Sequence, residues 1–176
     1  MANREALREL QTRLASRLQA ARSGGVLASW LAVKVAGANY LFPLAQAGEI
    51  FPLSNVQSVP YCRPWFMGVT NLRGGLFGVV DLASFMADGS SPARTEQSLA
   101  ESSVVTFNPL LELNCALMVD ALAGLRKREA FVAEVTSPAG SATYFGSRFT
   151  DLDGVDWQEI NLRSLSQLPK FLSISV

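Results

Sequence analysis

The sequence predicts a mainly β protein that begins with a single α-helix. Apolar residues recur at helical spacing only near the start of the chain, and short β-branched and aromatic runs separated by turn residues replace that period afterwards. Of the 176 residues, 49% are hydrophobic and 17% are charged, which is enough apolar side chain for a core without disulfides or metals. A Ser/Gly/Pro-rich stretch in the middle of the chain divides the β region into two units.

Residues 1–23 are predicted to form an amphipathic helix that ends at the Ser23-Gly24-Gly25 sequence. The helix has two interpretations: its apolar face docks on the β body of the same chain, or it lies in a groove of a partner. Docking within the chain is favoured, because exposed apolar stripes are uncommon on monomers. The residues that share this face are Leu7, Leu10, Leu14 and Leu18.

The first β unit is expected over residues 29–86. Alternating apolar residues on either side of a Gly-Ala-Asn turn predict a hairpin, and two glycines between apolar runs predict a second one. A short helical turn is expected to close the unit. The expected strands are 30–35, 40–44, 49–51, 56–59, 69–72 and 76–80, and the helical turn is 82–86.

Residues 87–102 are rich in serine, glycine and proline, and we expect them to form a flexible connection. The second β unit then covers residues 103–172, and its C-terminal segment is a candidate to pack back on the first unit. The expected strands are 104–107, 115–119, 122–125, 144–149 and 155–160, followed by a helix at 162–168.

Composition excludes several classes of function. The chain contains no histidine, so Ser-His-Asp and Cys-His catalytic sites and histidine-ligated metal sites are ruled out. Cys62 and Cys115 are too few for a thiolate metal site, and no metal or other cofactor is expected. Fifteen basic and fifteen acidic residues give no net charge that would recruit nucleic acid. No run of about 18 apolar residues predicts membrane insertion, so a cytoplasmic protein is expected.

The segment over residues 65–82 stands out as a candidate site. Arg73 lies at a glycine turn between two apolar runs, and arginine is the side chain best suited to bidentate pairing with a carboxylate. Arg73 is either the partner of a structural ion pair or a recognition residue, and the chemistry of the segment alone does not decide between them.

This segment resembles the CheW family of chemotaxis coupling proteins, whose hallmark is a Gly-Val-x-Asn-Leu-Arg-Gly stretch followed by a Val-x-Asp-Leu element. The resemblance covers roughly residues 29–172, although Gly78 stands where the family usually has proline. The sequence of residues 65–78 and the additional N-terminal helix resemble the branch of the family that serves type IV pilus twitching motility more than the branch that serves flagellar chemotaxis. The matching motif residues are Gly68, Val69, Asn71, Leu72, Arg73, Gly74, Val79, Asp81 and Leu82, with a second Val-Asp pair ending at Asp120.

The resemblance implies two SH3-like five-stranded β-barrel subdomains and a non-catalytic adaptor. Such an adaptor couples the cytoplasmic tip of a methyl-accepting receptor to a CheA-like histidine kinase, and its partners recruit it to membrane receptor arrays. The family's partner-binding positions fall on Glu49, Asn71, Arg73 and Gly74. We expect Glu49 and Arg73 to form an ion pair beside the groove between the subdomains, where loss of one desolvated partner costs about 2–5 kcal/mol in binding.

The sequence also leaves two other functions open. A small β-barrel could bind a small ligand or a single nucleic-acid strand, which calls for exposed aromatic residues in a basic groove. An enzyme could use Cys62 as a nucleophile, because the neighbouring Arg63 would lower the pKa of the thiol.

Overall fold

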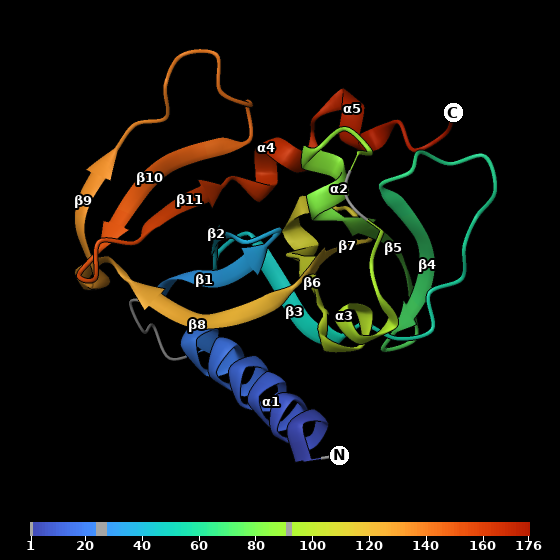
Figure 1. The fold of residues 1–176 in the computed structure, drawn as a ribbon, viewed down its shortest axis with the longest axis horizontal. Coiled ribbons are helices and arrows are strands. Elements are labelled where there is room, and N and C mark those ends of the chain that lie inside the picture. Colours follow the sequence, from blue (N-terminus) through green and yellow to red (C-terminus); the bar gives the residue numbers. More distant parts are fainter. Residues whose placement is uncertain (1, 24–27, 91–92) are drawn as a thin grey trace.

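The computed structural model of the chain describes residues 2–23, 28–90 and 93–176. Two β-sheets lie side by side, and the N-terminal helix α1 (Ala2–Ser23) packs below them (Figure 1). The mainly β fold with an N-terminal helix is confirmed.

The first sheet has six strands in the order β8-β1-β2-β11-β10-β9. Its neighbours pair antiparallel, except that β11 runs parallel to β2 with Gln158 opposite Tyr40. The strands are β1 (Ala28–Val35), β2 (Ala38–Pro43), β8 (Ala121–Lys127), β9 (Phe131–Val135), β10 (Phe145–Asp151) and β11 (Asp156–Ile160).

The second sheet has five strands in the order β3-β6-β7-β5-β4. It too contains one parallel pair, β5 with β7, in which Asp81 lies opposite Met118. The strands are β3 (Ala47–Pro52), β4 (Phe66–Leu72), β5 (Gly75–Asp81), β6 (Ser103–Phe107) and β7 (Cys115–Val119).

The two sheets do not divide the chain at residues 87–102 as expected. The first sheet takes β1 and β2 from before this segment and β8 to β11 from after it, and the second sheet is mixed in the same way. The physical reason is that each sheet contains a parallel pair, and parallel strands require a long crossover connection rather than a hairpin. The sheets therefore contain six and five strands, each drawn from both halves of the sequence.

Short helices fill the connections: α2 (Leu82–Met86), α3 (Glu96–Glu101), α4 (Leu162–Ser166) and α5 (Pro169–Leu172). The segment expected to be a flexible connection thus contains α3, whose N-cap Thr95 accepts a hydrogen bond from the Ser98 N–H at 3.1 Å. The strand expected at 56–59 is reduced to one bridge between Gln57 and Val69. Phe171 of α5 stacks on Trp65, which brings the C-terminal segment back against residues of the first half.

One continuous apolar core joins the two sheets. It contains Leu31 and Phe42 from the six-stranded sheet and Val80 and Leu117 from the five-stranded sheet, all fully or almost fully buried. The side chains that connect the sheets in this way make the chain one packed unit.

Helix α1 docks within the chain. Leu14 and Leu18 are buried in the common core, Leu7 is half-buried, and Leu10 remains 47% exposed. The Gln11 amide also donates a buried hydrogen bond to the Ser103 hydroxyl at 2.6 Å, which fixes the position of the helix along β6. Within the described ranges, no helix has the length and apolarity needed to cross a membrane.

Candidate functional site

Arg73 lies at the tip of the β4–β5 hairpin. Leu72 and Gly75 pair across a two-residue turn, and Arg73 and Gly74 both have positive φ angles, +49° and +81°. The Asn71 side-chain oxygen accepts the Gly74 N–H at 2.9 Å and holds the turn. This turn favours glycine or asparagine at both central positions, so arginine at the first of them costs about 1 kcal/mol. The hairpin thus presents a long charged side chain at a position where a small residue would be more stable.

Glu49 of β3 forms the predicted ion pair with Arg73. The Arg73 Nε lies 3.0 Å from Glu49 Oε2, and Nη1 lies 3.4 Å from Oε1. The Arg73 side chain is 67% exposed and that of Glu49 43% exposed, so the pair contributes about 0–1 kcal/mol to folding. The Arg73 guanidinium lies over the Phe51 ring, with its central carbon 5.9 Å from the ring centroid. The pair is therefore accessible to a partner.

The ion pair joins the two outer strands of the five-stranded sheet, because β3 and β4 lie at opposite ends of the strand order. The segment after β3 also contacts β4, since Gln57 and Val69 exchange backbone hydrogen bonds of 2.8 and 2.9 Å. Gly68 makes this approach possible: its φ is +137°, and a Cβ there would lie 2.0 Å from the Gln57 carbonyl oxygen.

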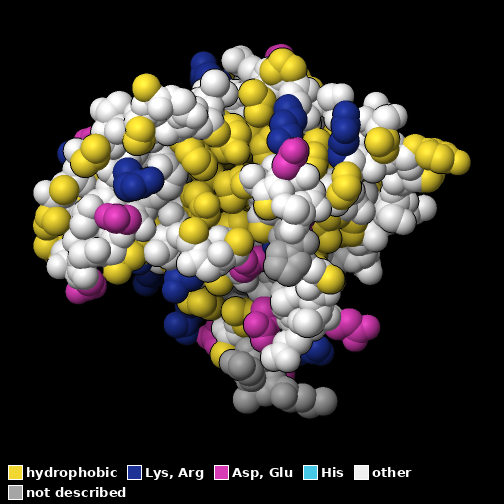
Figure 2. All heavy atoms as spheres, turned by 45° about the horizontal axis from the view of Figure 1, so that its top comes forward, with side chains coloured by type: hydrophobic (Ala, Val, Ile, Leu, Met, Phe, Trp, Pro, Cys, Tyr) yellow, Lys and Arg dark blue, Asp and Glu magenta, His cyan; other side chains and the backbone are white. Residues whose placement is uncertain are grey.

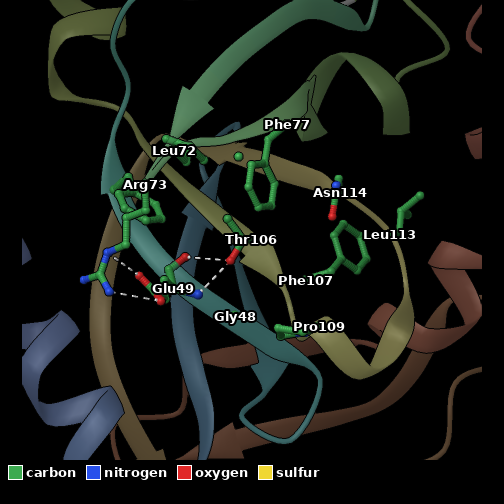
Figure 3. A pocket seen from close by; sticks show the side chains of 12 residues that line it. Gly48, Glu49, Leu72, Arg73, Phe77, Thr106, Phe107, Pro109, Leu113 and Asn114 are labelled. Carbon is green, nitrogen blue, oxygen red and sulfur yellow. Dashed lines mark hydrogen bonds and ion pairs between the residues drawn. The ribbon is translucent and has the colours of Figure 1, made fainter.

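A cavity of about 360 Å³ opens beside the ion pair. All of its lining belongs to the five-stranded sheet and its connections, so it does not lie between the two sheets where the ion pair was expected. Phe77, Phe107 and Leu113 lie on the far side of Thr106 from the ion pair (Figure 3). The site combines an exposed charge pair with an adjacent apolar hollow.

Thr106 positions Glu49 from the neighbouring strand. Its hydroxyl accepts the Glu49 N–H at 2.7 Å. Gly48 permits this contact, because a Cβ at that position would lie 2.1 Å from the Thr106 hydroxyl. Neither residue could be identified from the sequence, since their role depends on the pairing of β3 with β6.

Comparison with known proteins shows which family this chain belongs to. The model of the CheW-like domain matches residues 29–168. The chain belongs to the CheW family. Helix α1 lies outside the matched residues.

Two relatives illustrate this membership. The protein PilI of Pseudomonas aeruginosa is 27% identical over 114 residues, which are 65% of this chain and 61% of PilI. The scaffolding protein TtCheW of Thermoanaerobacter tengcongensis has a similar structure, with a TM-score of 0.59 and 16% identity over 74% of this chain and 86% of that chain. The likeness to TtCheW shows a shared fold.

Most of the remaining CheW-family motif residues are buried, whereas Val69 and Asp120 are half-exposed. Leu72 and Val79 are buried with Met118 in a cluster within the five-stranded sheet, and Leu82 is fully buried in the common core. Asp81 caps α2 by accepting the Ser84 N–H at 3.3 Å. Of the motif, Asn71, Arg73 and Gly74 at the hairpin tip are therefore the most exposed positions.

Arg94 binds both motif aspartates and was not identified from the sequence. It donates from Nε and Nη2 to the two Asp81 oxygens, at 2.7 Å each, and from Nη1 to Asp120. The other Asp120 oxygen accepts the Ala36 N–H, in the turn between β1 and β2, at 2.6 Å. Hydrogen bonding to Asp81, and then to Asp120, raises the pKa of Arg94 above its usual value, although burial opposes this. These contacts tie the two sheets together.

The two cysteines differ in exposure, since Cys115 is buried and Cys62 is half-buried. Burial raises the pKa of the Cys115 thiol to about 12, which keeps it protonated at neutral pH. The sulfur of the half-buried Cys62 lies 3.7 Å from the Pro60 carbonyl oxygen.

Proposed function

We propose that this protein is a non-catalytic adaptor that couples a methyl-accepting receptor to a CheA-like histidine kinase. The observation that carries the proposal is the match to the CheW-like domain over residues 29–168, together with the exposed hairpin tip of its motif. The similarity to PilI supports a place in the system that controls type IV pilus twitching motility. The chain has no histidine, so it carries no phospho-accepting histidine of its own.

The proposal assigns partner binding to Glu49, Asn71, Arg73 and Gly74. The ion pair is solvated in the free protein, and the apolar hollow beside it would accept a side chain of the partner. Binding would then desolvate both charges, and a charge left without its counterpart would weaken the complex.

A second surface supports contact with the receptor tip. Hydrophobic side chains gather in the middle of one face, between the part formed by β9 to β11 and the part that carries α2 and α5 (Figure 2). An adaptor that holds receptor and kinase on separate surfaces transmits a signal through geometry, since a receptor rearrangement then biases the kinase between its states.

The experiment is a reconstitution of kinase, receptor cytoplasmic fragments and this protein. We expect receptor control of kinase activity only when the protein is present. Arg73→Glu should weaken binding of one partner by about 2 kcal/mol, or roughly 30-fold. Arg148→Glu is the matched control, because Arg148 is an exposed arginine of β10 in the other sheet. Receptor control of the kinase without this protein contradicts the adaptor role.

Exchanging the charges of Glu49 and Arg73 distinguishes a role in partner recognition from a purely structural role. The double variant Glu49→Arg, Arg73→Glu keeps a pair between β3 and the hairpin tip but reverses both charges. If Arg73 recognises a partner, the double variant binds as weakly as Arg73→Glu. Restored binding in the double variant would show that the pair acts only by holding the sheet together.

A further inference from the structure

A basic cleft lies beside α1. It has a volume of about 380 Å³ and is walled on one side by Arg4, Leu7 and Arg8 of the helix. The other wall includes Leu53, which follows β3, and Ala100 of α3. The lining thus combines apolar side chains with the polar Gln11 and Ser54 and with two arginines one helical turn apart.

These two arginines lack partners within the described part of the chain. Neither the Arg4 nor the Arg8 guanidinium takes part in an ion pair or hydrogen bond there, whereas Arg13 on the same helix pairs with Glu9 at 2.9 Å. Residues 1–22 hold five arginines and two glutamates, a net charge of +3, and the other residues hold ten basic and thirteen acidic ones, a net charge of −3. The cleft therefore favours an occupant that combines acidic groups with an apolar side chain.

The turn between β10 and β11 has this chemistry. Leu152 is 75% exposed and is followed by Asp153 and Asp156. The Asp153 side chain has no hydrogen-bond or ion-pair partner among residues 2–23, 28–90 and 93–176. We call residues 151–156 the acidic knob. Asp156 accepts one hydrogen bond, from the Thr150 hydroxyl at 2.8 Å, and keeps its second oxygen for another donor.

The acidic knob is held in one conformation by Asp151. Its carboxylate accepts the N–H groups of Asp153 and Val155 and the indole N–H of Trp157, each at 2.9 Å. Because the turn is already ordered, binding through Leu152 loses little conformational entropy.

We propose that the acidic knob of one copy of this chain inserts into the α1 cleft of a second copy. Leu152 packs against the apolar side chains of the cleft, and Asp153 and Asp156 lie against Arg4 and Arg8. The contact forms between copies, because the β10–β11 turn lies at the left edge of the molecule and the N-terminal end of α1 lies well away from it, below the middle (Figure 1). Knob and cleft are different surfaces, so the association is head-to-tail and extends into rings or filaments.

The first test is sedimentation of the full chain over a range of concentrations. We expect the mass to rise above the 19.0 kDa of the monomer, and to rise less at high salt because the arginine contacts are charged. Arg8→Glu and Leu152→Asp should each weaken the association at least tenfold. Arg17→Glu and Leu110→Asp are the matched controls, since Arg17 is exposed on the same helix outside the cleft and Leu110 is exposed on another surface.

Mixing variants tests the head-to-tail geometry. Leu152→Asp keeps an intact cleft and Arg8→Glu keeps an intact knob, so the two together should form a dimer that does not extend further. A variant with Asp153→Arg and Asp156→Arg should in turn bind Arg4→Glu, Arg8→Glu more tightly than it binds the unmodified chain.

Two results would overturn the proposal. One is a monomer at protein concentrations up to about 1 mM, the weak end of the affinity scale. The other is an association that Arg8→Glu and Leu152→Asp leave unchanged. Binding of kinase and receptor is measured separately, and its failure would leave the knob and cleft contact untouched.

Discussion

At the scale of single residues, Arg94 connects more of the structure than any motif position does. Its side chain is 15% exposed, and its two carboxylate partners come from the end of β5 and from the residue between β7 and β8. A guanidinium can bind Asp81 through two nitrogens and still reach Asp120, whereas an ammonium cannot reproduce this planar geometry.

Arg94→Ala should therefore lower the free energy of unfolding by about 3 kcal/mol, because it leaves a buried charge without its partner. Arg94→Lys should recover only part of this loss. Urea denaturation followed by tryptophan fluorescence measures both, with Arg148→Ala as the control for removal of an exposed arginine. A loss no larger for Arg94→Ala than for this control would show that the contacts with the two aspartates do not hold the sheets together.

The Glu49–Arg73 pair was predictable, but Arg94 was not. Glu49 and Arg73 occupy positions that the family resemblance marks, and the glycine turn beside Arg73 is visible in the sequence. Arg94 is the only basic residue in 87–102, which is a possible signal, yet its partners Asp81 and Asp120 are 13 and 26 positions away. Their meeting depends on the parallel pairing of β5 with β7, which no local pattern specifies.

At the scale of elements, α1 is an amphipathic helix in which only some of the leucines on the apolar face are buried against the body of the protein. Leu14 and Leu18 are buried against the body, whereas Leu10 faces outward. The helix is thus stabilised by a few tertiary contacts in addition to its propensity.

Leu18→Ala should destabilise the protein by about 3 kcal/mol, as expected for a leucine truncated in a packed core. Leu10→Ala removes the same atoms from an exposed position and should change stability by less than about 0.5 kcal/mol. Thermal unfolding of the two variants makes the comparison. Equal effects would mean that α1 does not dock on the body of its own chain.

The β10–β11 turn should respond to acid through Asp151. Hydrogen bonds from Trp157 and Val155 lower the pKa of Asp151 below the usual 3.8, because they stabilise the charged carboxylate. Their contribution is complete above the unfolded value of 3.8 and is lost as the pH falls through the lower folded value. The NMR signal of the Trp157 indole N–H should therefore shift with a midpoint below 3.8, and Asp151→Asn should abolish this titration. A midpoint at or above 3.8 would contradict the assignment.

Elements with a strong local signal were predicted, and those without one were missed. The β1–β2 and β4–β5 hairpins follow from turn residues between alternating apolar runs. Strand β9 was missed because four of its five residues are exposed, so its sequence does not show the alternation of buried apolar and exposed polar residues that marks a strand. Helix α3 was missed because polar residues dominate it and the apolar period is too short to recognise.

At the scale of the whole molecule, the interleaved sheets predict one cooperative unit. Each half of the sequence contains strands whose neighbours lie in the other half, and the common core includes side chains from both. The division at residues 87–102 looked natural in the sequence because the composition changes there. A polar composition indicates that a segment is exposed at the surface. It does not indicate which strands on either side of that segment pair with each other.

Fragments 29–86 and 103–172 should each fail to fold when they are expressed alone, since each would expose half of a shared core. The full chain should unfold in a single transition, with the same midpoint by tryptophan fluorescence and by circular dichroism. Dispersed amide signals in the NMR spectrum of either fragment would contradict this prediction.

The parallel pair of β2 and β11 also has a consequence for biosynthesis. Tyr40 and Leu41 emerge from the ribosome long before their partners Gln158 and Glu159. Until then one edge of the first hairpin has no partner strand, and free strand edges promote aggregation. The first sheet therefore cannot be completed until β11 has left the ribosome.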